Sequence, residues 1–96
     1  MLYEKKIASI PMCLKALRSM DLDSGLRIRG RYNKRNAYLF VTKSPSGYAV
    51  AIYSVKRQGK ATLPEKQLLI EELNSDDEVG RLIAQTATKP LSAYSY

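Results

Sequence analysis

Residues 25–57 read GLRIRGRYNKRNAYLFVTKSPSGYAVAIYSVKR, and this stretch decides the fold that the sequence predicts. It opens with strict alternation, in which Leu26 and Ile28 point to one side of the chain. The intervening residues Arg27, Arg29 and Arg31 point to the other side. Alternation with period two is typical of a half-buried β-strand. We therefore predict a strand with one apolar face and a row of arginines on the other.

Two more apolar runs follow at residues 37–43 and 48–57, and both are rich in Tyr, Val and Ile, which favour strands. Residues 44–47, SPSG, are turn-forming types and predict a hairpin between the two runs. The polar residues 33–36, NKRN, predict a tight turn before the first run. Both runs are apolar on both sides, which predicts central strands covered on much of each face. The pattern leaves open which residues of these strands face the core.

One helix is expected on each side of these strands along the chain. Residues 11–20 carry apolar side chains at helical spacing, and a proline at their start suits the first turn of a helix capped by Ser9 or Ile10. The sequence SDDE beginning at Ser75 is a capping-box pattern, which marks a helix start. An apolar stripe then predicts a second helix over residues 76–88.

The remaining segments give weaker patterns. Residues 65–73 fit a helical stripe or a fourth strand, and we favour a strand because a helix start follows directly. Residues 2–8 fit a short edge strand or a helical turn. Residues 58–62 are expected to form a loop. Residues 89–96 show no periodicity, which predicts a flexible C-terminal tail.

These patterns predict a single α+β domain over residues 1–88, followed by the tail at 89–96. The domain has a three- or four-stranded antiparallel sheet, with an N-terminal and a C-terminal helix packed on one face. A hydrophobic share of 45% in 96 residues is enough for one modest core.

Several residue types that catalysis or metal binding requires are scarce in the sequence. The chain has no histidine and one cysteine, Cys13, so the commonest general base and thiolate metal sites are absent. No glycine-rich phosphate loop or nucleophile motif is present. Residues 21–25, DLDSG, end the first helix rather than begin a calcium loop, since the later ligands do not follow. We expect neither an enzyme nor a protein with a cofactor or metal.

The sequence also bears on location. No apolar run reaches the ~20 residues that a transmembrane helix needs, so we expect no membrane association. The first residues, MLYEKK, lack the apolar region of a secretory signal, and a single cysteine forms no internal disulfide. The expected location is cytoplasmic.

Charge is the bulk property that departs most from an ordinary globular protein. The net charge is +7, and it is unevenly distributed. Residues 1–57 hold twelve Lys and Arg against three acidic residues, whereas residues 58–96 hold four basic residues against six acidic ones. A basic body favours polyanionic partners.

The row of arginines predicts a face that binds the backbone of DNA or RNA. Alternate residues of a strand lie ~6.6–6.8 Å apart, close to the interval between neighbouring phosphates, and guanidinium groups match phosphate bidentately. Nearby tyrosines suit stacking on bases or on arginines. The predicted contact residues are Arg27, Arg29, Arg31, Lys34, Arg35, Tyr38, Lys43, Lys56 and Arg57. The alternative is an exposed sheet face or edge whose charge prevents aggregation.

A protein-binding function fits the same sequence. Small, charged α+β proteins without catalytic residues occur in viruses and mobile elements, where they act as regulators or inhibitors by occupying a host protein's surface. The basic face would then dock on an acidic patch, or the acidic residues 71–78 would imitate phosphate. Seven tyrosines support either class, because Tyr is enriched at interfaces. A homodimer formed through a sheet edge is a further expectation.

Overall fold

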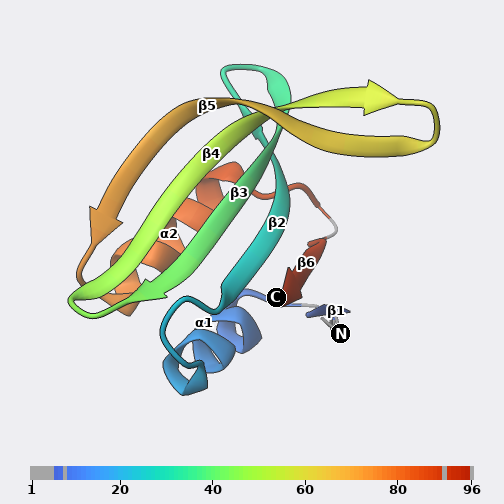
Figure 1. Ribbon diagram of the computed structural model, residues 1–96. Helices are drawn as coiled ribbons and strands as arrows, with labels where there is room; N and C mark the ends of the chain where they lie inside the picture. The colour runs from blue at the N-terminus through green and yellow to red at the C-terminus, as the bar shows by residue number, and fades with distance from the viewer. Residues whose placement is uncertain (1–5, 8, 90, 96) are drawn as a thin grey trace.

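The alternating segments form the long strands of one antiparallel sheet. The computed structural model describes residues 6–7, 9–89 and 91–95 (Figure 1). The strands within these residues are β1 (Lys6–Ile7), β2 (Gly25–Tyr32), β3 (Arg35–Ser44), β4 (Gly47–Gln58), β5 (Ala61–Leu73) and β6 (Ala93–Ser95). They lie in the order β1-β6-β2-β3-β4-β5, and every neighbouring pair is antiparallel. The helices are α1 (Ile10–Ser19) and α2 (Asp76–Thr86).

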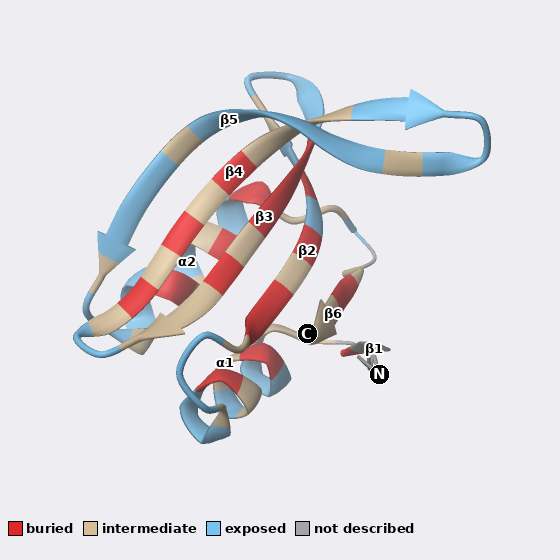
Figure 2. Ribbon diagram, viewed as in Figure 1, coloured by how far each residue is buried: buried red, intermediate tan, exposed pale blue. Residues whose placement is uncertain are grey.

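One face of the sheet packs against both helices and forms the core. The alternate bands of buried residues along β2, β3 and β4 are visible in Figure 2. The fully buried side chains of this face are Leu26, Ile28, Leu39, Val41, Val50 and Ile52. The helices add Cys13, Leu17, Val79 and Ile83 to the same cluster. Full burial of one large aliphatic side chain stabilises a fold by ~1.5–3 kcal/mol, so this layer supplies most of the folding energy.

Both helices begin at the serines that the sequence indicates. Ser9 Oγ accepts a hydrogen bond from the backbone N–H of Met12 at 3.3 Å. Ser75 Oγ accepts from the backbone N–H of Glu78 at 3.3 Å, and its hydroxyl donates to the Glu78 carboxylate at 3.2 Å. Each cap satisfies a backbone donor that the helix itself leaves unpaired, which is worth ~0.5–2 kcal/mol.

The α+β class is confirmed, but the expected number of strands is wrong. Residues 65–73 form a strand as predicted, and β5 pairs with β4 along most of its length. The extra strands, β6 and β1, extend the sheet beyond β2. Strands of two or three residues are too short to show alternation in a sequence. In the segment 2–8, β1 supports the strand interpretation, while residues 1–5 and 8 lie outside the described residues.

The expectation of a flexible tail at 89–96 does not hold for β6. Ala93 is fully buried, and β6 pairs with β2 through positions that include Ile28 and Ala93. The short strand occupies the edge of β2 that β3 does not cover, so backbone groups of both strands gain partners. Residues 90 and 96 lie outside the described residues.

The loop expected at 58–62 is instead a two-residue turn at the tip of a projecting hairpin. Gly59 adopts a φ of 63°, which glycine accepts at little cost. Register shifts on either side of Tyr53 mark irregularities in the pairing of β4 with β5, and bulges of this kind increase strand twist. Residues 55–64 therefore leave the plane of the sheet (Figure 1). This segment is termed the β4–β5 arm.

Candidate nucleic-acid interface

The face of the sheet opposite the helices, termed the open face, presents arginines beside aromatic rings. In Figure 1, α2 lies behind the sheet and α1 lies below the lower end of β2, so neither of them covers this face. Cross-strand pairing aligns its residues in two rows. One row consists of Tyr94, Arg27, Phe40, Ala51 and Ile70, from β6 to β5. The adjacent row consists of Arg29, Tyr38, Tyr53 and Gln67, from β2 to β5.

The β4–β5 arm bends towards one end of the open face. The Tyr38 hydroxyl donates to the backbone carbonyl of Thr62 in the arm at 3.4 Å. At the base of the arm, the backbone N–H of Lys66 donates to Ser54 Oγ at 3.1 Å. Tyr38 is only 6% exposed, so its ring supports the arm rather than offering a free surface for a base. A hollow lies between the arm and the adjoining ends of β2 and β3.

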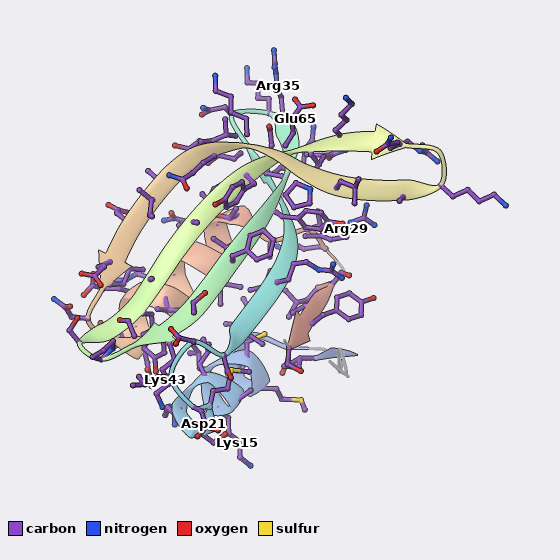
Figure 3. All side chains as sticks on the ribbon, in the orientation of Figure 1. Lys15, Asp21, Arg29, Arg35, Lys43 and Glu65 are labelled. Atoms are coloured by element: carbon purple, nitrogen blue, oxygen red, sulfur yellow. The ribbon has the colours of Figure 1, made fainter. Side chains whose placement is uncertain are left out.

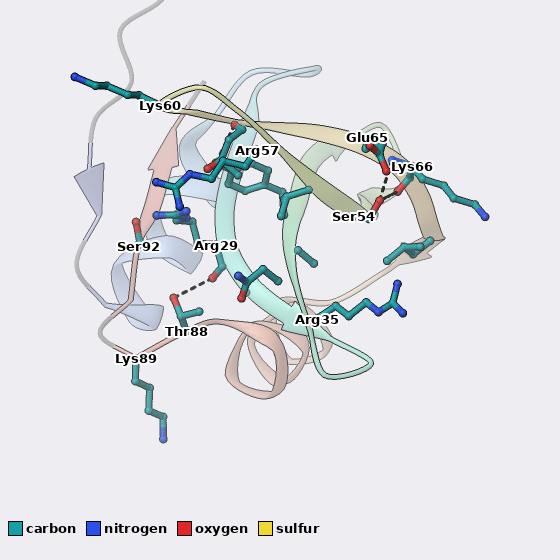
Figure 4. A pocket seen from close by; sticks show the side chains of 17 residues that line it. Arg29, Arg35, Ser54, Arg57, Lys60, Glu65, Lys66, Thr88, Lys89 and Ser92 are labelled. Carbon is teal, nitrogen blue, oxygen red and sulfur yellow. Dashed lines mark hydrogen bonds between the residues drawn. The ribbon is translucent and has the colours of Figure 1, made fainter.

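This hollow, termed the basic cleft, has a volume of about 1050 Å³ (Figure 4). Its walls come from β2, β3, the β4–β5 hairpin and the segment that follows α2. Its 17 lining residues include six cationic side chains and one carboxylate, Glu65. The cationic residues are Arg29, Arg35, Arg57, Lys60, Lys66 and Lys89. A concavity lined by one sign of charge concentrates the electric field and attracts counter-ions, here anions.

Backbone hydrogen bonds hold Thr88 and Ser92, in the segment after α2, against β2 and complete one wall of the cleft. The Arg29 carbonyl accepts from the N–H of Thr88 at 3.0 Å, and the Arg29 N–H donates to the carbonyl of Ser92 at 2.9 Å. Gly30 permits this approach, since a Cβ there would lie 2.5 Å from a carbonyl oxygen in the last turn of α2. Lys89, within this segment, lies at the margin of the cleft as a result, with its side chain directed outward (Figure 4).

A second hollow of about 320 Å³ adjoins the basic cleft on the open face. The residues that line both hollows are Arg29, Tyr38, Thr62 and Ser92. Arg27 and Tyr94 complete the lining of the second hollow. The Arg27 guanidinium carbon lies 5.3 Å from the ring centre of Tyr38 and 5.3 Å from that of Tyr94, within cation–π range. The two hollows together are termed the groove.

The structure brings five of the nine predicted contact residues to the groove. These residues are Arg27, Arg29, Arg35, Tyr38 and Arg57. Three others are exposed but do not line it: Arg31, Lys34 and Lys56. In the turn between β2 and β3, Arg31 donates to the backbone carbonyl of Lys34 at 3.3 Å, which directs its guanidinium along the turn.

Lys43, the ninth predicted contact residue, lies away from the groove. Because side chains alternate along β3, it shares the helix-covered face with Val41. Its ammonium donates to the backbone carbonyl of Arg18 at 2.7 Å, near the C-terminal end of α1, where the helix dipole favours a cation. Figure 3 shows Lys43 beside α1 and Arg29 and Arg35 towards the other end of the sheet. Lys43 therefore stabilises the fold and does not fit a contact made in the groove.

Three cationic residues of the cleft are not among the contact residues predicted from the sequence: Lys60, Lys66 and Lys89. The first lies in the turn of the arm, where a loop was expected, and the last lies in the expected tail. A signal for the arm does exist in the sequence, because residues 56–60 hold three cations around a single glycine. No sequence pattern places residue 89 beside residue 29.

The groove supplies positive charge and a concave shape, whereas the cysteine thiol lies outside it, in the core. Cys13 is fully buried, and burial raises the pKa of its thiol to about 11, so the thiol stays protonated at neutral pH. Within residues 6–7, 9–89 and 91–95, no group of three or more His, Cys, Asp or Glu side chains is placed to hold a metal ion. In the same part of the chain, no helix has the length and apolar character needed to cross a membrane.

Comparisons of the chain with protein-family models, with curated proteins and with solved structures find no match. A functional proposal therefore rests on the residues and geometry of the groove alone.

Proposed function

We propose that this protein binds nucleic acid through the sugar–phosphate backbone, which occupies the groove. The observation that carries the proposal is the presence of six cationic residues around one cleft whose lining includes a single carboxylate. These cations come from positions as far apart in the sequence as Arg29 and Lys89. Ordinary soluble surfaces intersperse charges of both signs, so a concave cluster of one sign favours a binding role.

The arginines of the groove suit phosphate in particular. A guanidinium group donates two parallel hydrogen bonds to phosphate oxygens, whereas a lysine acts as a point charge. Arg27 and Arg29 are two residues apart on one strand, a spacing of ~6.6–6.8 Å that is close to the interval between neighbouring phosphates. Contacts to phosphate carry no base information, so binding should be similar for unrelated sequences.

Fluorescence anisotropy with labelled oligonucleotides tests the proposal through its salt dependence. If all six cations of the basic cleft contact phosphates, log K falls with log salt at a slope of about −5 for duplex DNA and about −4 for single strands. Between 50 and 200 mM salt, these slopes lower the affinity by roughly 250- to 1000-fold. An absence of binding to DNA and RNA at 50 mM salt would contradict the proposal.

A pair of charge-matched variants locates the contact. The double variant Arg57→Gln/Lys60→Gln removes two exposed cations of the cleft and should flatten the slope by about 1.4–1.8. The control Lys15→Gln/Arg81→Gln removes two exposed cations from the helices and should leave the slope unchanged. Equal losses in both variants would show that net charge, and not the groove, attracts the nucleic acid.

A protein partner is the second candidate, and the exposed edge of the sheet favours it. β5 is an edge strand, with Leu68 38% and Ile70 65% exposed next to exposed Glu71 and Glu72. Such an edge is a template for pairing with a strand of another protein or of a second copy. A pull-down from native lysate with and without nuclease separates the candidates, because a protein partner remains bound after nuclease treatment and a nucleic acid does not.

A further inference from the structure

We infer that the groove accepts a single nucleic-acid strand, of DNA or RNA, whose bases stack on aromatic side chains of the open face. The inference rests on the proposed function and goes further, because it names the form of the nucleic acid. Three properties of the groove carry it: its volume, the placement of its cations and the rings to which it leads.

The volume of the basic cleft suits a single nucleic-acid strand better than a duplex. About 1050 Å³ is the volume of a cube about 10 Å on each edge. The major groove of a duplex alone is ~12 Å wide, so the whole duplex is wider than such a cube. A single strand has one sugar–phosphate chain with its bases free to turn aside. Such a chain can bring its phosphates to the cations inside the cleft.

The cations surround the opening of the cleft rather than lining one wall. In Figure 4, Lys60 in the turn of the arm and Lys89 after α2 lie far apart and extend outward, and Arg29 and Arg57 lie between them. A backbone that passes between the arm and β2 therefore meets positive charge from both sides. A positively charged channel that follows one backbone is the arrangement by which proteins bind single strands without base preference.

The groove lies next to aromatic rings on which the paired bases of a duplex could not stack. Tyr94 lines the second hollow, is half-buried, and carries the Arg27 guanidinium against its ring. Phe40 follows in the same cross-strand row, and its ring centre lies 5.5 Å from that of Tyr53. Stacking on such rings requires bases that are not paired and stacked within a duplex. A strand with its phosphates in the groove thus has bases within reach of Tyr94 and the neighbouring rings.

The test compares three labelled probes in 50 mM salt: a ten-nucleotide DNA strand, an RNA strand of the same sequence, and the corresponding DNA duplex. Both single strands should bind at least tenfold more tightly than the duplex, and the tighter of the two identifies the preferred sugar. Tyr94→Leu should weaken single-strand binding roughly tenfold, the range measured for loss of one base–aromatic stack. Tyr94→Phe keeps the ring and should bind within about twofold of the parent protein.

The outcomes distinguish a failure of the single-strand inference from a failure of the proposed function. Duplex binding as tight as single-strand binding would overturn this inference and leave the proposed function standing, whereas no binding of any probe would overturn both. A folded Tyr94→Leu protein that binds single strands as tightly as the parent would overturn stacking on Tyr94. If circular dichroism shows that Tyr94→Leu is unfolded, Tyr53→Leu with its control Tyr53→Phe replaces it, and an unchanged affinity of Tyr53→Leu would overturn stacking on the open face.

Discussion

The two faces of β2, β3 and β4 are built from alternate residues of the same segments, yet they differ in what they do. On the helix-covered face, Leu39 is fully buried in the apolar core. On the open face, Arg27 and Arg29, which flank Leu39's cross-strand partner Ile28 along β2, line the groove. A slip of the register by one residue would exchange the faces and bury the arginines, so one pattern specifies both the core and the groove. It follows that substitutions on one face should change stability and those on the other should change binding.

The largest effect on stability is expected on the helix-covered face. Leu39→Ala removes a fully buried side chain from the centre of the sheet and should lower the free energy of unfolding by roughly 2–5 kcal/mol. Urea denaturation measures this loss, and the dissociation constant of the folded variant for nucleic acid should stay within about twofold of the parent. A large loss of affinity in the folded variant would contradict the proposal that one face determines stability and the other determines binding.

A smaller loss of stability, together with weaker nucleic-acid binding, is expected for a substitution at Gly30. In Gly30→Ala the new Cβ would lie 2.5 Å from the Thr86 carbonyl oxygen, so the end of α2 and the adjoining residues 87–89 have to shift. Overpacking of this kind costs ~1–3 kcal/mol, and here it should also weaken nucleic-acid binding, because Lys89 moves with the segment.

Gly80→Ala is the matched control for this substitution. Its Cβ would meet the flexible end of Leu14 at 3.3 Å, and alanine gains up to ~1 kcal/mol of helix propensity over glycine. Its stability should therefore stay close to that of the parent. If Gly30→Ala were as stable as Gly80→Ala and bound equally well, the close contact between β2 and the segment after α2 would be refuted.

The smallest effect concerns a polar contact of the helix-covered face. The Tyr48 hydroxyl donates to the Asp76 carboxylate at 2.9 Å, and burial together with this bond raises the pKa of Tyr48 above its usual value. The folded protein therefore holds the phenol proton more tightly than the unfolded chain, so this contribution is complete below about pH 10 and is lost as the pH rises further. Tyr48→Phe should cost ~0.5–1.5 kcal/mol at pH 8.

Urea denaturation of both proteins at pH 8 and at pH 11 measures this contribution. The difference between them should narrow at the higher pH, where the Tyr48 phenol ionises in the unfolded parent chain. A difference that does not change with pH would contradict the assigned role of the Tyr48 hydroxyl.

The sequence predicts the faces of β2 well, because alternation there is strict and the intervening residues are all large. Leu26 and Ile28 are fully buried, and Arg27 and Arg29 lie on the opposite face as expected. The same rule, applied along β3, would have placed Lys43 on the helix-covered face. Lys43 was included among the predicted contact residues for its charge and its place at a strand end.

The groove itself could not be predicted, because its walls come from contacts between distant segments. The twist that carries the β4–β5 arm out of the sheet depends on irregular pairing around Tyr53. The position of Lys89 depends on backbone bonds to Arg29, which involve no side-chain pattern. Three-residue β6 has too few positions for periodicity to appear. Local patterns thus predict the strands, whereas the groove arises from their tertiary arrangement.

The most direct test of the central claim is a map of the contact surface by NMR. Amide chemical shifts of the ¹⁵N-labelled protein would be followed during titration with a ten-nucleotide DNA strand at low salt. The proposed function predicts that the largest changes cluster in β2, the β4–β5 arm and residues 87–92, and that α1 and α2 change little. Changes centred on the outer edge of β5 or on α1, or no changes at all, would contradict binding in the groove.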